Sequence, residues 1–197
     1  GISEMGEMEA LQSIIRPSIG ILTNIGGAHQ ENFYSVPDKC MEKLTLFKEC
    51  DVVVYDGDNE LISSCVGKSL FGAREIAWSK TDNERPLYIS SIEKGETSTT
   101  IRYRYLGMPN EYTIPFIDDA SIENSLHCLA VCLYMMLPAE KITERMAHLE
   151  PIAMRLEVKE GKNGWLSGIT SGLIIIITTI ILSVFTKTSF TLAYLVK

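Results

Sequence analysis

Residues 19–29 read IGILTNIGGAH, and this stretch decides the fold. Its first part, residues 19–25, is a short and mainly apolar run, which is typical of a strand buried on both faces of a parallel sheet. The run ends in the pair Gly26-Gly27, a common turn signal. We therefore expect a buried parallel strand whose exit loop carries His29.

The sequence downstream predicts a crossover to a second strand. Residues 37–38 (Pro-Asp) are typical of a helix start, and Met41, Leu44 and Phe47 then recur at helical spacing. Residues 51–55 (DVVVY) have the composition of another buried strand. A strand, a helix and a strand in this order predict a right-handed crossover unit.

The patterning elsewhere predicts further helices and a second kind of sheet. The expected elements are a helix over 7–15, an antiparallel meander over 87–116, a helix over 121–137 capped by Asp118 and Asp119 and ending at Pro138, a helix over 139–149 and a strand over 154–158. The fold class is therefore α/β, with a mostly parallel sheet flanked by helices and a small antiparallel β meander.

Composition argues against one class of partner. The chain has 18 Lys and Arg against 25 Asp and Glu, a net charge of -7, and a pI near 5.0. Because scattered basic residues offer no continuous cationic surface, we expect no nucleic-acid partner. The 5 irregularly spaced cysteines do not form a disulfide framework, which indicates a reducing cytoplasm. The opening residues, 1–10, show no apolar signal-peptide core.

The C-terminal tail differs in composition from the rest. Residues 163–186 contain no charged side chain, and residues 165–185 match the roughly 20 residues that a membrane-crossing helix needs. Two interpretations stay open: a genuine membrane anchor, which would make the protein membrane-associated, or a foreign or out-of-frame terminus. We expect one domain over residues 1–163 and an apolar, helix-like tail over residues 164–197.

His29 and Lys43 are the candidate chemical groups. His29 follows the carboxyl end of a predicted parallel strand, where open α/β sheets bind ligands, although a loop histidine satisfied by backbone groups is the alternative. Lys43 lies on the next helix and can point back toward His29. Its amine would repel a cation, but a lysine that has reacted with CO2 is a carbamate, whose two oxygens suit Mg²⁺. The alternative is a solvated lysine paired with Glu42 or Asp38.

Three weaker candidates each have a structural alternative that we favour. Residues 56–59 (DGDN) could touch a metal or a ribose, but a polar turn is the simpler interpretation. Cys128 and Cys132 lie one helical turn apart beside His127, yet their helix is apolar enough for core packing. The Tyr and Arg alternation at residues 101–105 is similar to a base-stacking platform, but it also fits an ordinary sheet face. The sequence contains no GxxxxGK[ST] phosphate loop.

An ordered set of motifs resembles the central ATP-binding domain of the Mur ligases, which build the peptide of bacterial cell-wall precursors. The motifs are TNIGGAH at 23–29, EKLTLF at 42–47, SIEN at 121–124 and MRLE at 154–157. The resemblance covers residues 1–163 and implies a partial Mur ligase central domain.

The resemblance also implies a role for each matching residue. His29 matches the family histidine that helps to hold Mg²⁺, and Lys43 matches the lysine that the family carbamylates for the same metal. Asn124 matches an asparagine that contacts adenine. Arg155 matches an arginine that reaches the ATP phosphates.

The implied activity is that of an ATP-dependent amide ligase. Within the family, the motifs are most similar to those of the members that add D-alanyl-D-alanine to UDP-N-acetylmuramoyl (UDP-MurNAc) tripeptide through an acyl phosphate, with ATP and Mg²⁺. Ala120 and Ser121 depart from the usual His-Asn pair, which weakens the expected nucleotide contacts there. The resemblance places the family's phosphate loop and Mg²⁺-binding glutamate before Gly1, and a third domain after the tail begins. We therefore expect the isolated piece not to turn over.

Two other functions stay open at this point. A Mur-type ligase that adds a different amino acid is the first. The second is a non-catalytic remnant anchored at the membrane by residues 165–185.

Overall fold

The computed structural model describes residues 4–26, 30–69 and 72–149, together with three short strands farther along the chain. The helices are α1 (Glu7–Ile15), η1 (Gln30–Asn32, a 3-10 turn), α2 (Val36–Thr45), α3 (Glu60–Ser69), α4 (Asp119–Tyr134) and α5 (Ala139–Ala147). The strands are β1 (Ile19–Leu22), β2 (Val52–Asp56), β3 (Arg74–Ser79), β4 (Leu87–Lys94), β5 (Thr99–Tyr105), β6 (Met108–Ile114), β7 (Lys159–Glu160), β8 (Leu166–Ser167) and β9 (Leu192–Leu195).

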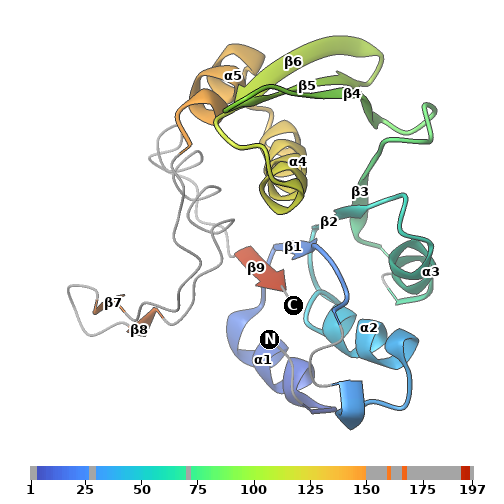
Figure 1. The fold of residues 1–197 in the computed structure, drawn as a ribbon. Coiled ribbons are helices and arrows are strands. Elements are labelled where there is room, and N and C mark those ends of the chain that lie inside the picture. Colours follow the sequence, from blue (N-terminus) through green and yellow to red (C-terminus); the bar gives the residue numbers. More distant parts are fainter. Residues whose placement is uncertain are drawn as a thin grey trace.

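One mixed sheet organises the described residues. Its strand order is β6-β5-β4-β3-β2-β1-β9. The strands β1 to β4 are parallel to one another, with Ile19 opposite Val52 and Trp78 opposite Leu87. The strands β4, β5 and β6 form an antiparallel meander that curls over α4 (Figure 1). The α/β fold class, the parallel unit and the meander are therefore confirmed.

The sheet separates two hydrophobic cores. Alternate residues of the parallel strands face opposite ways, so Ile21 and Val54 pack with α4, α5 and the meander, whereas Leu22 and Val53 pack with α1, α2 and α3. Both faces of the parallel strands are thus covered, which explains why β1 and β2 are apolar on both sides.

Gly20 marks the closest approach between a strand and the segment that follows α2. A Cβ at this residue would lie 2.6 Å from the Phe47 ring, so only glycine lets the ring rest on β1. The strand β1 carries no side chain at that point, and Phe47 is fully buried in its place.

Several predicted details differ from the structure. The long helix α4 ends at Tyr134, before Pro138, because Met136 adopts a left-handed conformation (φ 56°) that a helix cannot continue. Met41 is partly exposed, and two lysines occupy the buried face of α2 instead. The sequence patterning did not reveal α3 or β3. The strand predicted over 154–158 lies outside the described residues.

The tail contributes strand where it is described. Leu166–Ser167 pairs with Lys159–Glu160, and β9 pairs in parallel with β1. The helix-like prediction is wrong for these short segments, because an edge strand such as β1 offers unpaired backbone groups that an extended segment satisfies. The remainder of residues 165–185 lies outside the described part of the chain. Within the described part, no helix is long and apolar enough to cross a membrane.

Candidate functional site

The carboxyl ends of β1, β2 and β3 meet at one edge of the sheet. The three strands are parallel and adjacent, so the loops that leave them lie side by side (Figure 1). The helix α4 begins on the same side of the sheet but beyond this edge. Asp119 at its start forms an ion pair of 2.6 Å with Lys94 at the far end of β4, and β4 starts where β3 ends. Ligands of open α/β sheets bind at such an edge.

The helix α2 begins at this edge and carries Lys43. The Ser35 hydroxyl oxygen caps the helix by accepting a hydrogen bond from the Asp38 backbone N–H at 3.2 Å, and Pro37 follows in the first turn. Lys43 lies on the buried face and is 1% exposed. The alternative of a solvated lysine is therefore wrong.

The two acids proposed as partners of Lys43 have other contacts. A Glu42 carboxylate oxygen accepts hydrogen bonds from the backbone N–H groups of Gly6 (2.7 Å) and Met8 (3.2 Å), which joins α2 to the start of α1. Asp38 accepts a hydrogen bond from the Ser35 hydroxyl at 2.6 Å. Both carboxylates thus accept hydrogen bonds at the N-terminal ends of helices.

Burial changes the chemistry of the Lys43 amine. Loss of hydration, followed by repulsion from the charge of Lys39, lowers the pKa of Lys43 to about 8. A larger fraction of the amine is therefore neutral near pH 7 than in an exposed lysine. The neutral amine is the form that adds to CO2, so this environment is compatible with the carbamate that the family resemblance implies for Lys43.

Lys39 is a second buried lysine, which the sequence reasoning missed. It is 2% exposed, and its ammonium donates a hydrogen bond of 2.7 Å to the carbonyl oxygen of Gly26, in the loop that follows β1. The ammonium also lies 5.8 Å from the centre of the Phe33 ring. Its spacing of one helical turn before Lys43 was the available sequence signal.

Asn124 lies on the opposite side of the sheet from Lys43. The Asp118 carboxylate caps α4 by accepting from the Ser121 backbone N–H at 2.8 Å, and Asn124 follows, half-buried, in the second turn. The structure therefore places Asn124 and Lys43 on helices that both start toward the carboxyl ends of the parallel strands but cover different faces of the sheet. His29 and Arg155 lie outside the described residues, so their predicted roles stay predictions.

The cysteine and histidine group of α4 is part of a core. Cys128, Cys132 and His127 are fully buried, and His127 accepts a hydrogen bond of 3.2 Å from the Trp78 indole. Within the described ranges, no group of three His, Cys, Asp or Glu side chains is arranged to hold a metal. The geometry supports core packing for this group.

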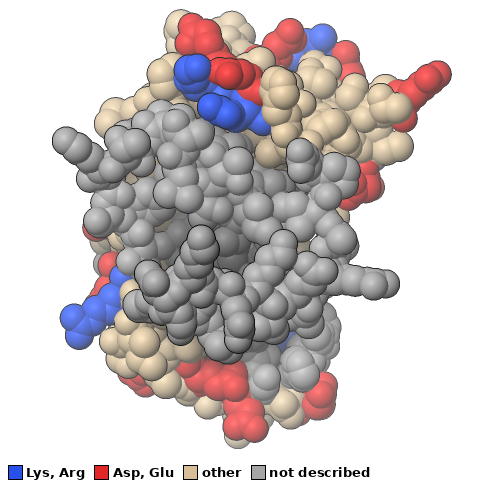
Figure 2. All heavy atoms as spheres, turned by 90° about the vertical axis from the view of Figure 1, so that its left-hand side faces the viewer, with Lys and Arg blue, Asp and Glu red and all other residues tan. Residues whose placement is uncertain are grey.

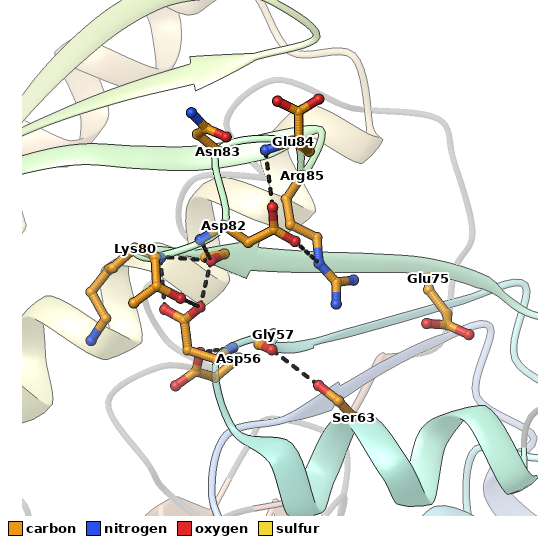
Figure 3. A network of polar contacts seen from close by, with 12 residues as sticks. Asp56, Gly57, Ser63, Glu75, Lys80, Asp82, Asn83, Glu84 and Arg85 are labelled. Carbon is orange, nitrogen blue, oxygen red and sulfur yellow. Dashed lines mark hydrogen bonds and ion pairs between the residues drawn. The ribbon is translucent and has the colours of Figure 1, made fainter.

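Residues 56–59 form a polar turn that joins β2 to the loop after β3 (Figure 3). The Asp58 carboxylate accepts hydrogen bonds from the Ser79 hydroxyl, from the Thr81 hydroxyl at 2.7 Å and from the Lys80 backbone N–H at 2.7 Å. Burial opposes ionisation of Asp58, but these donors outweigh it and lower its pKa. Because its oxygens are used in this way, the turn interpretation is favoured over a metal or ribose contact.

The carboxylate of the neighbouring Asp56 has fewer hydrogen-bond donors around it than that of Asp58. Its carboxylate accepts one hydrogen bond, at 2.9 Å, from the Asp58 backbone N–H. Burial raises the pKa of Asp56, and that hydrogen bond opposes the change only in part. Asp56 therefore shapes the turn together with Asp58.

The meander presents an ordinary sheet face. Ile101 and Tyr103 of β5 are buried, whereas Arg102 is exposed and pairs with Glu111 at 3.1 Å. On the face drawn in Figure 2, the visible basic side chains occur in small groups beside acidic ones. No base-stacking platform is formed by residues 101–105, because the tyrosine between the two arginines points into the core.

Comparisons with known proteins agree with this fold. Residues 1–132 match the family model described as the Mur ligase middle domain. A UDP-N-acetylmuramoyl-tripeptide--D-alanyl-D-alanine ligase of Bacillus subtilis is 28% identical over 171 residues, which cover 83% of this chain and 35% of the relative. The chain thus spans about a third of the length of that relative.

Solved structures give the same answer for the fold. MurF from Acinetobacter baumannii superposes with a TM-score of 0.67 at 16% identity, covering 83% of this chain and 36% of its own. MurF ligase from Thermotoga maritima, solved in complex with ADP, gives a TM-score of 0.65 at 18% identity and covers 81% of this chain and 37% of its own. The chain belongs to the Mur ligase middle domain family.

Proposed function

We propose that this chain forms part of the ATP and Mg²⁺ site of a ligase that adds D-alanyl-D-alanine to UDP-MurNAc-tripeptide. The observation that carries the proposal is the burial of Lys43, with its lowered pKa, on the helix that starts at the ligand-binding edge of a Mur ligase middle domain. A lysine that served only as a solvated charge would lose hydration on burial and gain nothing from it. The name of the Bacillus subtilis relative supports the choice of substrates.

The four matching residues would bind the cation and the ATP in this reaction. ATP phosphorylates the substrate carboxylate to an acyl phosphate, and the incoming amine displaces the phosphate. Mg²⁺, when bound, offsets the negative charge that gathers on the phosphate oxygens. Lys43, as a carbamate, and His29 would hold the cation, Asn124 would contact the adenine, and Arg155 would reach the phosphates.

The cellular setting follows from the same proposal. We place the ligase in the cytoplasm. The thiols of all five cysteines (Cys40, Cys50, Cys65, Cys128 and Cys132) are free and buried, in agreement with a reducing compartment. We further propose that residues 1–163 constitute the ligase portion and that residues 164–197 are not part of it, although β9 pairs with β1.

The test is a hybrid ligase in which residues 4–149 of this chain replace the aligned segment of the Bacillus subtilis relative. The hybrid is expected to release phosphate from ATP only when UDP-MurNAc-tripeptide and D-alanyl-D-alanine are both present. Because about two thirds of the hybrid comes from that relative, loss of ligase activity in the hybrid is the result that would contradict the proposal.

Matched variants of the hybrid test Lys43 itself. Lys43→Ala should abolish turnover, and an added short-chain carboxylic acid should restore part of it by supplying carboxylate oxygens to the metal. The control is Lys48→Ala, because Lys48 is a partly exposed lysine just beyond α2 that pairs with Glu9 at 3.6 Å. Full activity of Lys43→Ala would remove this lysine from the mechanism.

A further inference from the structure

Two buried lysines lie one turn apart on the same face of α2. Lys39 and Lys43 are 2% and 1% exposed, and both belong to the part of the helix that packs toward the sheet. Side chains four residues apart on a helix are neighbours. Two protonated amines at this spacing repel each other, and the charge of Lys39 is one of the causes that lower the pKa of Lys43.

The contacts of Lys39 fix its ammonium at the edge of the sheet. It donates at 2.7 Å to the Gly26 carbonyl oxygen and lies 5.8 Å from the centre of the Phe33 ring, which is itself buried. A carbonyl oxygen and an aromatic face both favour a cation. Lys39 is therefore held as a positive charge between the loop after β1 and α2.

Carbamylation reverses the sign of the interaction between the two lysines. The neutral Lys43 amine attacks CO2, a nitrogen–carbon bond forms, and the proton lost from nitrogen goes to solvent, which leaves one negative charge on the carbamate oxygens. The amine pair repels while both are protonated. The ammonium and carbamate pair attracts, and it does so in a buried site where charges interact strongly.

We propose that Lys39 is a positioning residue that stabilises the carbamate of Lys43 by supplying its counter-charge. The inference rests on the proposed function, because it requires Lys43 to be carbamylated. It assigns to Lys39 a role that the sequence motifs did not indicate. The hydrogen bond to Gly26 keeps the ammonium in place for that role.

The experiment measures carbamate on the purified chain without nucleotide or metal. The chain is equilibrated with ¹³C-labelled bicarbonate, and the carbamate carbon is followed by NMR as the bicarbonate concentration rises. Lys43→Gln assigns the signal. The series is recorded at pH 9, above the Lys43 pKa of about 8, and again at a higher pH. Because Lys39→Gln also removes the repulsion that lowers the pKa of Lys43, only a loss of occupancy that persists at the higher pH is assigned to the missing counter-charge.

Three variants separate the charge of Lys39 from its hydrogen bond. Lys39→Gln keeps a donor for Gly26 but removes the charge, and it should need about tenfold more bicarbonate for half occupancy. Lys39→Arg keeps the charge and should stay within about twofold of the parent chain. Lys48→Met removes a partly exposed lysine and should have no effect. Thermal unfolding of each variant confirms that it is folded.

The outcomes distinguish this inference from the proposed function. Equal occupancy in the parent chain and in Lys39→Gln overturns the role of Lys39 and leaves the carbamate intact. An equal loss in Lys39→Gln and Lys39→Arg also overturns it, because the positive charge would then not be the cause. Absence of the carbamate signal from the parent chain removes the modified lysine from the proposed function and this inference with it.

Discussion

The indole Nε1 of Trp78 donates a hydrogen bond of 3.2 Å to Nδ1 of His127, and the two rings meet edge to face with centroids 5.4 Å apart. Because Nδ1 accepts, the proton of the neutral imidazole lies on Nε2, 4.0 Å from a Glu123 carboxylate oxygen. This pair joins the end of β3 to α4, the helix that carries Asn124.

The pair predicts a loss of stability in acid. Burial lowers the pKa of His127 to about 3, whereas an unfolded histidine has a pKa near 6.5. Below pH 6.5 the unfolded chain therefore binds a proton that the folded chain does not, and stability falls as the pH falls toward 3. Between pH 7.5 and 5 this histidine should cost about 2 kcal/mol of unfolding free energy.

Urea unfolding at several pH values measures that cost. In His127→Asn the amide oxygen can still accept from Trp78, but the acid-dependent part of the slope should vanish. His148→Asn is the control, because His148 is exposed beyond α5 and should leave the slope unchanged. An unaltered slope in His127→Asn would show that His127 is not the group responsible.

Gly20 predicts a steric requirement in β1. In Gly20→Ala the new methyl group would lie within 2.6 to 2.9 Å of the Phe47 ring, so the ring must move and the free energy of unfolding should fall. We expect about 1 to 3 kcal/mol, as for other overpacked cores. The matched change is Gly67→Ala on the exposed side of α3, where no atom lies within 4 Å, and it should instead stabilise the chain by about 0.5 to 1 kcal/mol. Equal effects of the two substitutions would contradict the close approach.

Asp58 predicts a structural role for the turn after β2. In Asp58→Ala the Ser79 and Thr81 hydroxyls and the Lys80 N–H lose their acceptor, and unfolding free energy should fall by about 2 kcal/mol. Asp119→Ala removes an exposed carboxylate and should have a smaller effect. Denaturant unfolding compares the two variants. A stable Asp58→Ala chain with weakened nucleotide binding would favour the ribose or metal interpretation instead.

The adenine contact proposed for Asn124 predicts that this residue contributes to nucleotide selectivity in the hybrid ligase. Loss of an adenine contact in Asn124→Ala should weaken ATP binding about tenfold, or 1.4 kcal/mol, and reduce the preference for ATP over GTP. The control is Asn110→Ala in β6, whose amide donates to the Met108 carbonyl oxygen within the meander. Calorimetric titration with both nucleotides provides the comparison. A variant that binds both more weakly, with its selectivity unchanged, would indicate a structural effect alone.

Apolar runs and caps predicted much of the fold. The strands β1 and β2 are buried on both faces, so their residues 19–22 and 52–55 are continuous apolar runs that pattern analysis detects. The helix α4 was visible because Asp118 caps it and its interior is apolar. Because these elements are extensively buried, their apolar composition indicates their secondary structure.

The elements that were missed lack such patterns. The strand β3 begins with exposed Arg74 and Glu75, because β4 pairs only with its last residues, Trp78 and Ser79. The helix α3 contains Ser63, Ser64 and Gly67, which are weak helix formers. In both β3 and α3, tertiary contacts determine the secondary structure more than the local sequence does.

The site was predicted through motifs rather than through patterning. Hydrophobic spacing placed Met41 inside, whereas the structure buries Lys39 and Lys43. Periodicity does not predict a buried amine, because hydrophobic spacing assigns apolar residues to the buried face of a helix and burying an amine costs stability. Matching EKLTLF to a family motif identified Lys43, but no motif pointed to Lys39.

The central claim is that His29 and the carbamate of Lys43 bind one divalent cation beside the nucleotide. Mn²⁺, which accepts the same oxygen and imidazole ligands and is paramagnetic, tests it most directly when added with ADP to the hybrid ligase labelled with ¹³C at the carbamate and in its histidine rings. The account predicts that the carbamate carbon and the His29 ring broaden together at one equivalent of Mn²⁺, while the His148 ring stays sharp. Broadening of only one of the two groups, with the other sharp, would contradict it.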